Sequence, residues 1–283
     1  MTVRTMLIAA SGGSASDGAI ETACRIAGRL GARLEALHVK ADPTQIVTMA
    51  AEGYTMPVAG EWIDRVIADA DALAKRTEAA FAAAAARHNL PLAAAEHGPS
   101  AAFRVETGYG PHLVARHARF FDLVVLGRSE RVVERPHSDA IEETLTRSGR
   151  PVLLAPAKPP ATIGRAVAFG WNGSAEAVHA LAAAMTLFEK ADAVTVITVG
   201  TEEEDPQPVI GYLAWHGVTA KRVIAMPVAG VDAGEQLLSE ARNVGADLLV
   251  MGAYGHRPWR EILFGGATRR IIGTSLLPVL LAH

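Results

Sequence analysis

The chain has 283 residues, half of them hydrophobic and a fifth charged, with a formal net charge of −3 at pH 7. This length allows two ordinary domains, and the composition is that of a folded protein rather than a disordered one. Lysine and arginine total 27 against 30 aspartate and glutamate residues, and no basic block is present. We therefore expect no nucleic-acid partner, because that binding requires a surface that neutralises phosphates.

Cys24 is the only cysteine, so no disulfide can form within the chain, which suits a reducing compartment. The apolar run Met6–Ala10 is too short for the core of a signal peptide, and no apolar stretch reaches the length of a membrane span. The ten histidines are scattered without metal-ligand spacing, so we expect no metal site. These observations favour a cytoplasmic protein without a membrane partner.

Short apolar runs alternate along the chain with stretches of helical periodicity. In the first half we expect strands at 6–10, 33–39, 101–107, 121–126 and 151–155, and helices at 16–30, 61–88, 110–118 and 137–147. Gly31 is expected to end the first helix, and residues 42–60, rich in proline and glycine, to form a long loop. After a stiff, exposed linker at 156–160 we expect strands at 166–169, 193–199, 219–225, 248–251 and 277–281, and helices at 175–188, 209–216, 230–244 and 269–274,.

The second half repeats motifs of the first. Gly13-Ser14 and Gly173-Ser174 each follow the first strand of a half, and the sequence PVLLA occurs at both 151–155 and 278–282. An aspartate and a glycine, five residues apart, bracket the fourth strand of each half (122 and 127; 247 and 252). Such regular repetition indicates two copies of one unit. We predict domains at residues 1–156 and 163–283.

Continuous apolar strands that alternate with helices predict an α/β fold with parallel sheets covered on both faces. Five strands in each half suit two doubly wound sheets of order 3-2-1-4-5, in which ligands bind where strands 1 and 4 end. In the second half the turn 170–174 follows strand 1, and the stretch 252–255 follows strand 4. We expect these two segments to face each other across one crevice. The glycines of the second segment, continued at Gly265 and Gly266, predict a phosphate cradle beside a helix N-terminus.

With these motifs the chain resembles a tandem universal stress protein over essentially all of both halves. Nucleotide-binding members of that family carry, after strand 4, two glycines separated by two residues and then, after nine intervening residues, a glycine followed by serine or threonine. Gly252, Gly255 and Gly265 fit that spacing, Gly266 takes the place of the hydroxyl residue, and Thr268 lies close enough in sequence to supply a hydroxyl. By the same resemblance the family's acidic residue that contacts the nucleoside corresponds to Asn172, and Val199 lines the base pocket.

The resemblance implies an adenine-nucleotide site in the second half, with ATP as the ligand, AMP or ADP as alternatives, and Mg²⁺ accompanying ATP. It also implies that the fifth strands of the two halves meet in an intrachain pseudo-dimer, and a homodimer of the whole chain is a further expectation. The expected nucleotide-binding residues are Gly170, Trp171, Asn172, Val199, Met251, Gly252, Gly255, Gly265, Gly266, Ala267 and Thr268. In the first half Glu130 replaces the second glycine, and Ser138 and Asp139 replace the last pair, so we expect an empty site there.

Structural alternatives exist for these features. The glycines after strand 4 can serve tight packing, Trp171 and Trp259 can cap an adenine ring or pack against the protein, and Ser174 is expected to be a helix N-cap. No general base or positioned nucleophile is evident, so we expect no catalytic residues and at most slow ATP hydrolysis. Three functions stay open: an adenine-nucleotide binder in stress response, a non-binding member that acts through protein contacts, and a nucleotidyl-transferring or electron-transfer relative.

Overall fold

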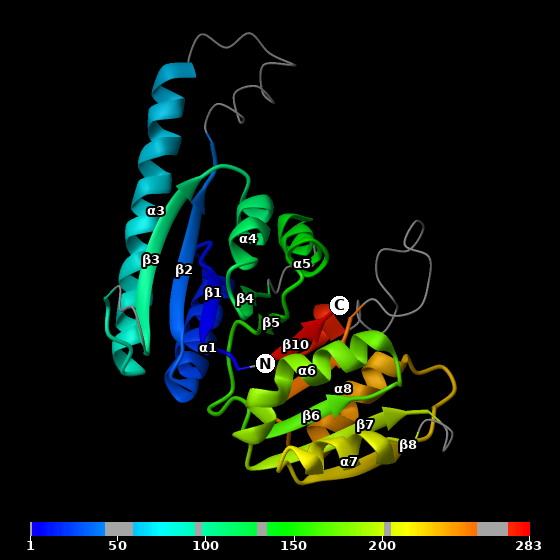
Figure 1. Cartoon of the computed structure of the whole chain (residues 1–283). Helices are drawn as coiled ribbons and strands as arrows, with labels where there is room; N and C mark the ends of the chain where they lie inside the picture. The colour runs from blue at the N-terminus through cyan, green and yellow to red at the C-terminus, as the bar shows by residue number, and fades with distance from the viewer. Residues whose placement is uncertain (1, 43–58, 94–97, 129–134, 201–204, 254–270) are drawn as a thin grey trace.

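A computed structural model describes residues 2–42, 59–93, 98–128, 135–200, 205–253 and 271–283 (Figure 1). The first half contains β1 (Thr5–Ala9), α1 (Ser14–Leu30), β2 (Arg33–Lys40), α3 (Ala59–Arg87), β3 (Ser100–Thr107), α4 (Gly110–Ala118), β4 (Leu123–Gly127), α5 (Arg135–Ser148) and β5 (Val152–Ala155). The second contains β6 (Ala166–Gly170), α6 (Ala175–Glu189), β7 (Ala193–Val199), α7 (Gln207–Trp215), β8 (Ala220–Ala225), α8 (Ala233–Asn243), β9 (Leu248–Gly252) and β10 (Val279–Ala282).

The expected strands and helices are present, with most boundaries shifted by a few residues, except that only residues 271–274 of the helix expected at 269–274 are described; these four are helical. Gly31 ends α1 as predicted: it adopts the left-handed conformation, with φ of 68°, and its N–H bonds to the carbonyl of Ala27,. The helix expected to begin at residue 230 begins at Ala233, because the Asp232 side chain caps it by accepting from Gly234 N at 2.8 Å,. The expected loop at 42–60 ends earlier than predicted, since α3 begins at Ala59; residues 43–58 lie outside the described part.

The strands form one ten-stranded sheet of order β3-β2-β1-β4-β5-β10-β9-β6-β7-β8. Each half therefore has the predicted doubly wound order 3-2-1-4-5, and its strand pairs are parallel. The two predicted sheets are joined because β5 and β10 pair antiparallel. The α/β fold is confirmed, and the fifth strands meet as expected.

The β5–β10 joint has approximate two-fold symmetry. Leu153 pairs with Leu280, its own counterpart in the repeated PVLLA motif, and the flanking pairs are Leu154 with Val279 and Val152 with Leu281. An approximate two-fold axis thus passes between Leu153 and Leu280, perpendicular to the sheet. This symmetry puts equivalent helices of the two halves on the same face.

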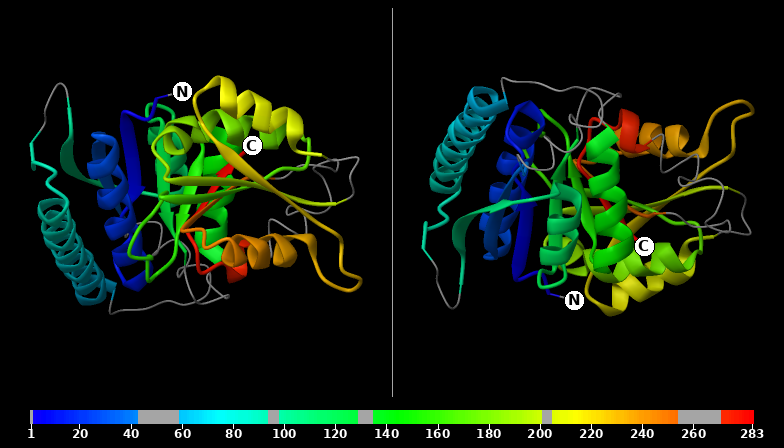
Figure 2. Two further views of the ribbon diagram at one scale, coloured as in Figure 1. Left: turned by 90° about the horizontal axis from the view of Figure 1, so that it is seen from below. Right: turned by 90° about the horizontal axis from the view of Figure 1, so that it is seen from above.

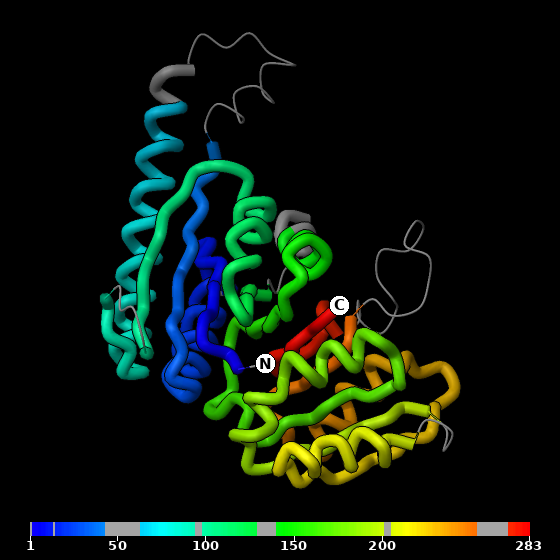
Figure 3. Tube along the Cα trace, viewed as in Figure 1, coloured from blue at the N-terminus to red at the C-terminus, as the bar shows by residue number. Residues whose placement is uncertain are grey.

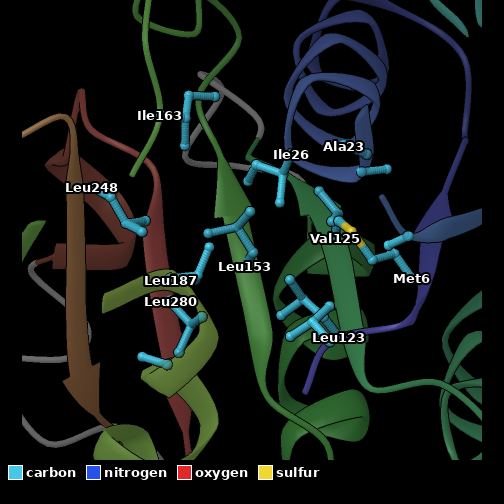
Figure 4. Packing of buried hydrophobic residues seen from close by; sticks show 14 of the residues in the cluster. Met6, Ala23, Ile26, Leu123, Val125, Leu153, Ile163, Leu187, Leu248 and Leu280 are labelled. Carbon is cyan, nitrogen blue, oxygen red and sulfur yellow. The ribbon is translucent and has the colours of Figure 1, made fainter. Parts of the chain in front are cut away.

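Helices cover both faces of the sheet. Buried side chains of α1, α3, α6 and α7 belong to one continuous core, and those of α4, α5 and α8 to the core of the other face. Figure 2 shows α7 and α8 on opposite sides of the second-half strands in both views. Figure 4 shows the first core crossing the joint, with Met6 and Val125 of the first half in the same cluster as Leu248. None of the described helices is long and apolar enough to cross a bilayer.

The linker between the halves is held against α1 rather than lying free. Arg25 donates to the carbonyls of Pro160 and Ala161, and Arg29 donates to Ile163 O and Lys190 O. Helix α1 approaches the linker so closely that a Cβ on Gly18 would lie 2.6 Å from Ala157 O. The expected exposure of the linker is therefore only partly correct, because α1 supplies donors that anchor it.

The two halves differ clearly in the length of the helix that follows the second strand. In the first half this helix, α3, has 29 residues. Its counterpart α7 has nine, and the trace in Figure 3 shows the contrast. The shorter helix leaves more of the second half uncovered.

Candidate functional site

The carboxyl ends of three neighbouring second-half strands lie at one edge of the sheet. Strand β6 lies between β7 and β9, and Gly170 at its end is in register with both Ile197 and Met251. Val199 ends β7 and Gly252 ends β9. Four of the expected nucleotide-binding residues, Gly170, Val199, Met251 and Gly252, therefore come together at this edge.

Gly170, Val199 and Met251 face α8. A Cβ on Gly170 would lie 2.7 Å from Leu237 Cδ2 of α8, so only glycine fits at this position without displacing that side chain. Met251 is buried and Val199 partly buried in the core beneath the same helix. Together they give this side of the edge an apolar surface.

Trp171 faces the opposite side of the sheet. Its backbone N–H donates to Ile197 O at 2.9 Å, which continues the β6–β7 pairing by one residue. Its ring packs against Phe169, with ring centroids 5.9 Å apart, under α6 and α7. There it lines a hollow of about 310 Å³ together with Val178, Leu181, Ala182, Pro208, Val209 and Tyr212. The structure thus separates Trp171 from the residues that face α8.

Asn172 is exposed in the turn between β6 and α6. Its Oδ1 accepts a hydrogen bond from Ser174 N at 3.2 Å. Because a backbone N–H can only donate, this bond fixes the amide orientation and leaves Nδ2 as the outward group, which is a donor. The Ser174 hydroxyl accepts from Ala177 N at 3.2 Å, which confirms the predicted N-cap of α6.

Gly252 has a packing role that needs no ligand. A Cβ at this position would lie 2.6 Å from Ala177 N and 2.6 Å from the carbonyl carbon of Glu176. Both are backbone atoms in the first turn of α6. In the first half a Cβ on Gly127 would likewise lie 2.8 Å from the carbonyl carbon of Ala15 in α1. The glycine after strand 4 therefore allows the same helix–strand contact in both halves.

The rest of the expected phosphate cradle lies outside the described residues. This applies to Gly255, Gly265, Gly266, Ala267 and Thr268, and also to Trp259. In the first half Glu130 and the side chains of Ser138 and Asp139 are also outside the described part. The proposed contacts of these residues stay predictions.

The matching turn of the first half is covered by α3. Gly12 stands where the second half has Asn172, and a Cβ on Gly12 would lie 2.7 Å from Leu73 Cδ1. Close by, the buried His38 donates from Nδ1 to Ala10 O at 2.6 Å. Sequence reasoning did not find this cover; the length of α3 was the one available signal.

Glu21 of α1 accepts hydrogen bonds from Arg25, Arg87 and His88, at 2.9, 2.9 and 2.7 Å. Burial by itself would raise the pKa of Glu21, but the hydrogen bonds from Arg87, His88 and Arg25 outweigh it and lower the pKa to about 2,. This carboxylate joins α1 to the end of α3. Burial raises the pKa of the nearby Cys24 thiol to about 12, so that thiol is unreactive.

The described residues contain no group of three His, Cys, Asp or Glu side chains that could hold a metal ion.

Comparisons with known proteins point to one family. The model of the universal stress protein family matches residues 219–283. A curated relative, the universal stress protein Slr1230 of Synechocystis sp., is 29% identical over 168 residues, which cover 56% of this chain and 57% of that protein. The chain thus spans little more than half the length of this relative.

Solved structures extend the likeness in fold to both halves. The crystal structure of a universal stress protein from Archaeoglobus fulgidus DSM 4304 matches with a TM-score of 0.72 and 14% identity, over 100% of this chain and 99% of that one. A functionally unknown protein from Pseudomonas aeruginosa PAO1 matches with a TM-score of 0.57 and 14% identity, over 99% and 92% of the two chains. At 14% identity, this likeness shows a shared fold and nothing finer.

Proposed function

Because the model of the universal stress protein family matches residues 219–283 and a curated universal stress protein is similar over 56% of the chain, we propose that the chain is a member of that family and binds an adenine nucleotide, ATP in the first place, at the edge formed by β6, β7 and β9. One observation carries the proposal: the strand register brings Gly170 and Met251 side by side, next to Gly252, the first glycine of the spaced motif. The exposed Asn172 begins the adjoining turn. Through this binding the protein would act in stress response in the cytoplasm.

Each side of the edge suits a different part of the nucleotide. Val199, which is only partly buried, offers apolar surface to a base beside the buried Met251, and the Asn172 amide nitrogen can donate to a ring nitrogen of adenine or to a ribose oxygen. The backbone N–H groups of Gly265 and Gly266 and the hydroxyl of Thr268 would bind phosphate oxygens. Mg²⁺ accompanying ATP would take most of its ligands from the phosphates and water.

Calorimetric titration of the purified chain with ATP and AMP, with and without Mg²⁺, tests the proposal. A binding nucleotide should also stabilise the fold, by about 2.7 kcal/mol at a concentration 100 times Kd. Gly255→Asp should abolish both effects, because it puts a carboxylate beside the phosphates. The matched first-half variant, Glu130→Gly, should leave them unchanged. Absence of heat and of stabilisation at millimolar ATP, with Gly255→Asp indistinguishable from wild type, would refute nucleotide binding.

The second candidate is a non-binding family member that acts through protein contacts. Its supporting observation is that close packing against α6 already explains why residue 252 is a glycine, without any bound phosphate. Native mass spectrometry of the freshly purified chain separates the candidates. A retained adenine nucleotide supports the first, and a ligand-free chain that does not respond to ATP supports the second. A bound flavin or an adenylylated product would instead support a catalytic relative.

A further inference from the structure

The middle of α6 and the whole of α7, called here the α6–α7 face, carry no formal charge; Glu176 and Glu189, the charged residues of α6, lie at its two ends. Residues 177–188 and 206–220 contain no Asp, Glu, Lys or Arg. Helix α8, on the other side of the same strands, includes Glu235, Glu240 and Arg242. A helix on a solvated surface normally has charged residues on its outer side. Nine of the 15 residues of α6 are buried within the chain itself, whereas α7 buries only Val209 and Leu213. The uncharged outer side of α7, together with the exposed Val178 and Ala182 of α6, therefore indicates a surface that is covered in the assembled protein.

A hollow and a projecting side chain lie next to each other on this face. The hollow between α6 and α7 measures about 310 Å³ and has Tyr212 and the exposed Ala182 in its wall. Trp215 lies one helical turn after Tyr212 and is 87% exposed, on the same side of α7. A cavity of roughly 150 Å³ holds a benzene molecule, so the hollow has room for an indole ring.

We propose that the α6–α7 face binds a second copy of this chain in a two-fold symmetric homodimer, with Trp215 of each copy in the hollow of the other. Two-fold contacts use the same surface on both partners, so projection and hollow must occur on one face, as they do here. Charge complementarity favours the same occupant. A neutral surface can meet itself without like-charge repulsion, and exposed Trp and Tyr are the residues that most often dominate binding energy.

The proposed contact does not depend on nucleotide binding. It also differs from the strand joint inside the chain, because β5 and β10 already pair with each other and leave no free edge there. Figure 1 shows α6 and α7 on the second half, away from α3 and β3 at the far end of the sheet.

Sedimentation velocity and light scattering on the full chain, without nucleotide, test the proposal. The wild type is expected at twice the chain mass of 29.7 kDa. Trp215→Glu should weaken the dimer by roughly tenfold or more, as loss of a central aromatic side chain does. Ala182→Glu, which puts a carboxylate into the hollow, should do the same. Because both positions are exposed, far-UV circular dichroism should stay at the wild-type value. The urea midpoint should equal that of wild type diluted below the Kd of the dimer, since association itself stabilises the folded chain.

Phe120→Glu is the matched control, since Phe120 is an aromatic residue of the first half that is 80% exposed. It should leave the dimer intact. A wild type that is monomeric up to about 100 µM, well above the range of stable dimers, would overturn the proposal. A dimer that persists in both Trp215→Glu and Ala182→Glu, or that Phe120→Glu disrupts equally, would assign dimerisation to another surface and would also overturn it.

Discussion

Replacing Gly252 by alanine separates a packing role from a ligand role. The added Cβ would lie 2.6 Å from two backbone atoms of α6, about 0.8 Å inside ordinary contact, and backbone cannot rotate away as a side chain can. Overpacking of this kind costs about 1–3 kcal/mol of folding free energy. Because the added Cβ meets backbone atoms of α6 that cannot move aside, we expect a cost of about 3 kcal/mol. Alanine regains about 0.5–1 kcal/mol over glycine within a strand. We therefore expect a net loss of about 2 kcal/mol.

The assay is urea unfolding of nucleotide-free protein, followed by far-UV circular dichroism. Gly127→Ala should lose a similar amount, because its Cβ would meet Ala15 of α1 in the same way. Gly273→Ala is the control, since no atom lies within 4 Å of a Cβ at this exposed position, and its stability should stay the same or rise slightly. If Gly252→Ala keeps or gains stability without nucleotide and loses only ATP binding, the packing explanation is wrong.

Two further predictions concern anchors in the fold. Asp122 accepts from Arg4 N and Thr5 N at 2.8 and 2.9 Å, and Asp247 accepts from the corresponding N–H groups of residues 165 and 166. Alanine at either position should cost about 2–4 kcal/mol in urea unfolding, since two amides lose their acceptor; losses below 0.5 kcal/mol would contradict this. Glu21 has a pKa of about 2 in the folded chain against an ordinary 4.5, so its contribution is complete above pH 4.5 and is lost as the pH falls towards 2. Wild type should therefore lose roughly 1–3 kcal/mol more than Glu21→Gln between pH 5 and pH 2.5, and equal losses would refute the assignment.

Local sequence signals predicted the fold well because they act over short distances. Continuous apolar runs mark parallel strands, and the glycine at 31 and the serine at 174 mark a helix end and a helix start by mechanisms that need only neighbouring residues. The repeat then supplied what local signals lack. Because the same aspartate and glycine bracket strand 4 in both halves, the repeat indicated that both halves have the same strand order.

The candidate site was less predictable, for a physical reason. A buried parallel strand is apolar on both faces, so its sequence does not reveal which face a residue at its end will take. Trp171 was grouped with Gly170 and Met251, yet strand alternation turns it to the opposite side, beneath α6 and α7. Likewise, the contacts of Arg25 and Arg29 with the linker join residues more than 130 positions apart, and no short-range pattern reports such a contact.

The comparison of the two halves explains why only the second is a candidate for ligand binding. In the first, the long helix α3 reaches the turn after strand 1, and Leu73 lies directly on Gly12. In the second, the corresponding helix has nine residues and the turn presents an exposed amide at Asn172. The same shortening leaves the hollow beside α7 open. A single change in one connecting helix thus accounts for both surfaces proposed here, the edge for a nucleotide and the face for a second copy. Because the two surfaces lie on different elements, variants of one should leave the other intact.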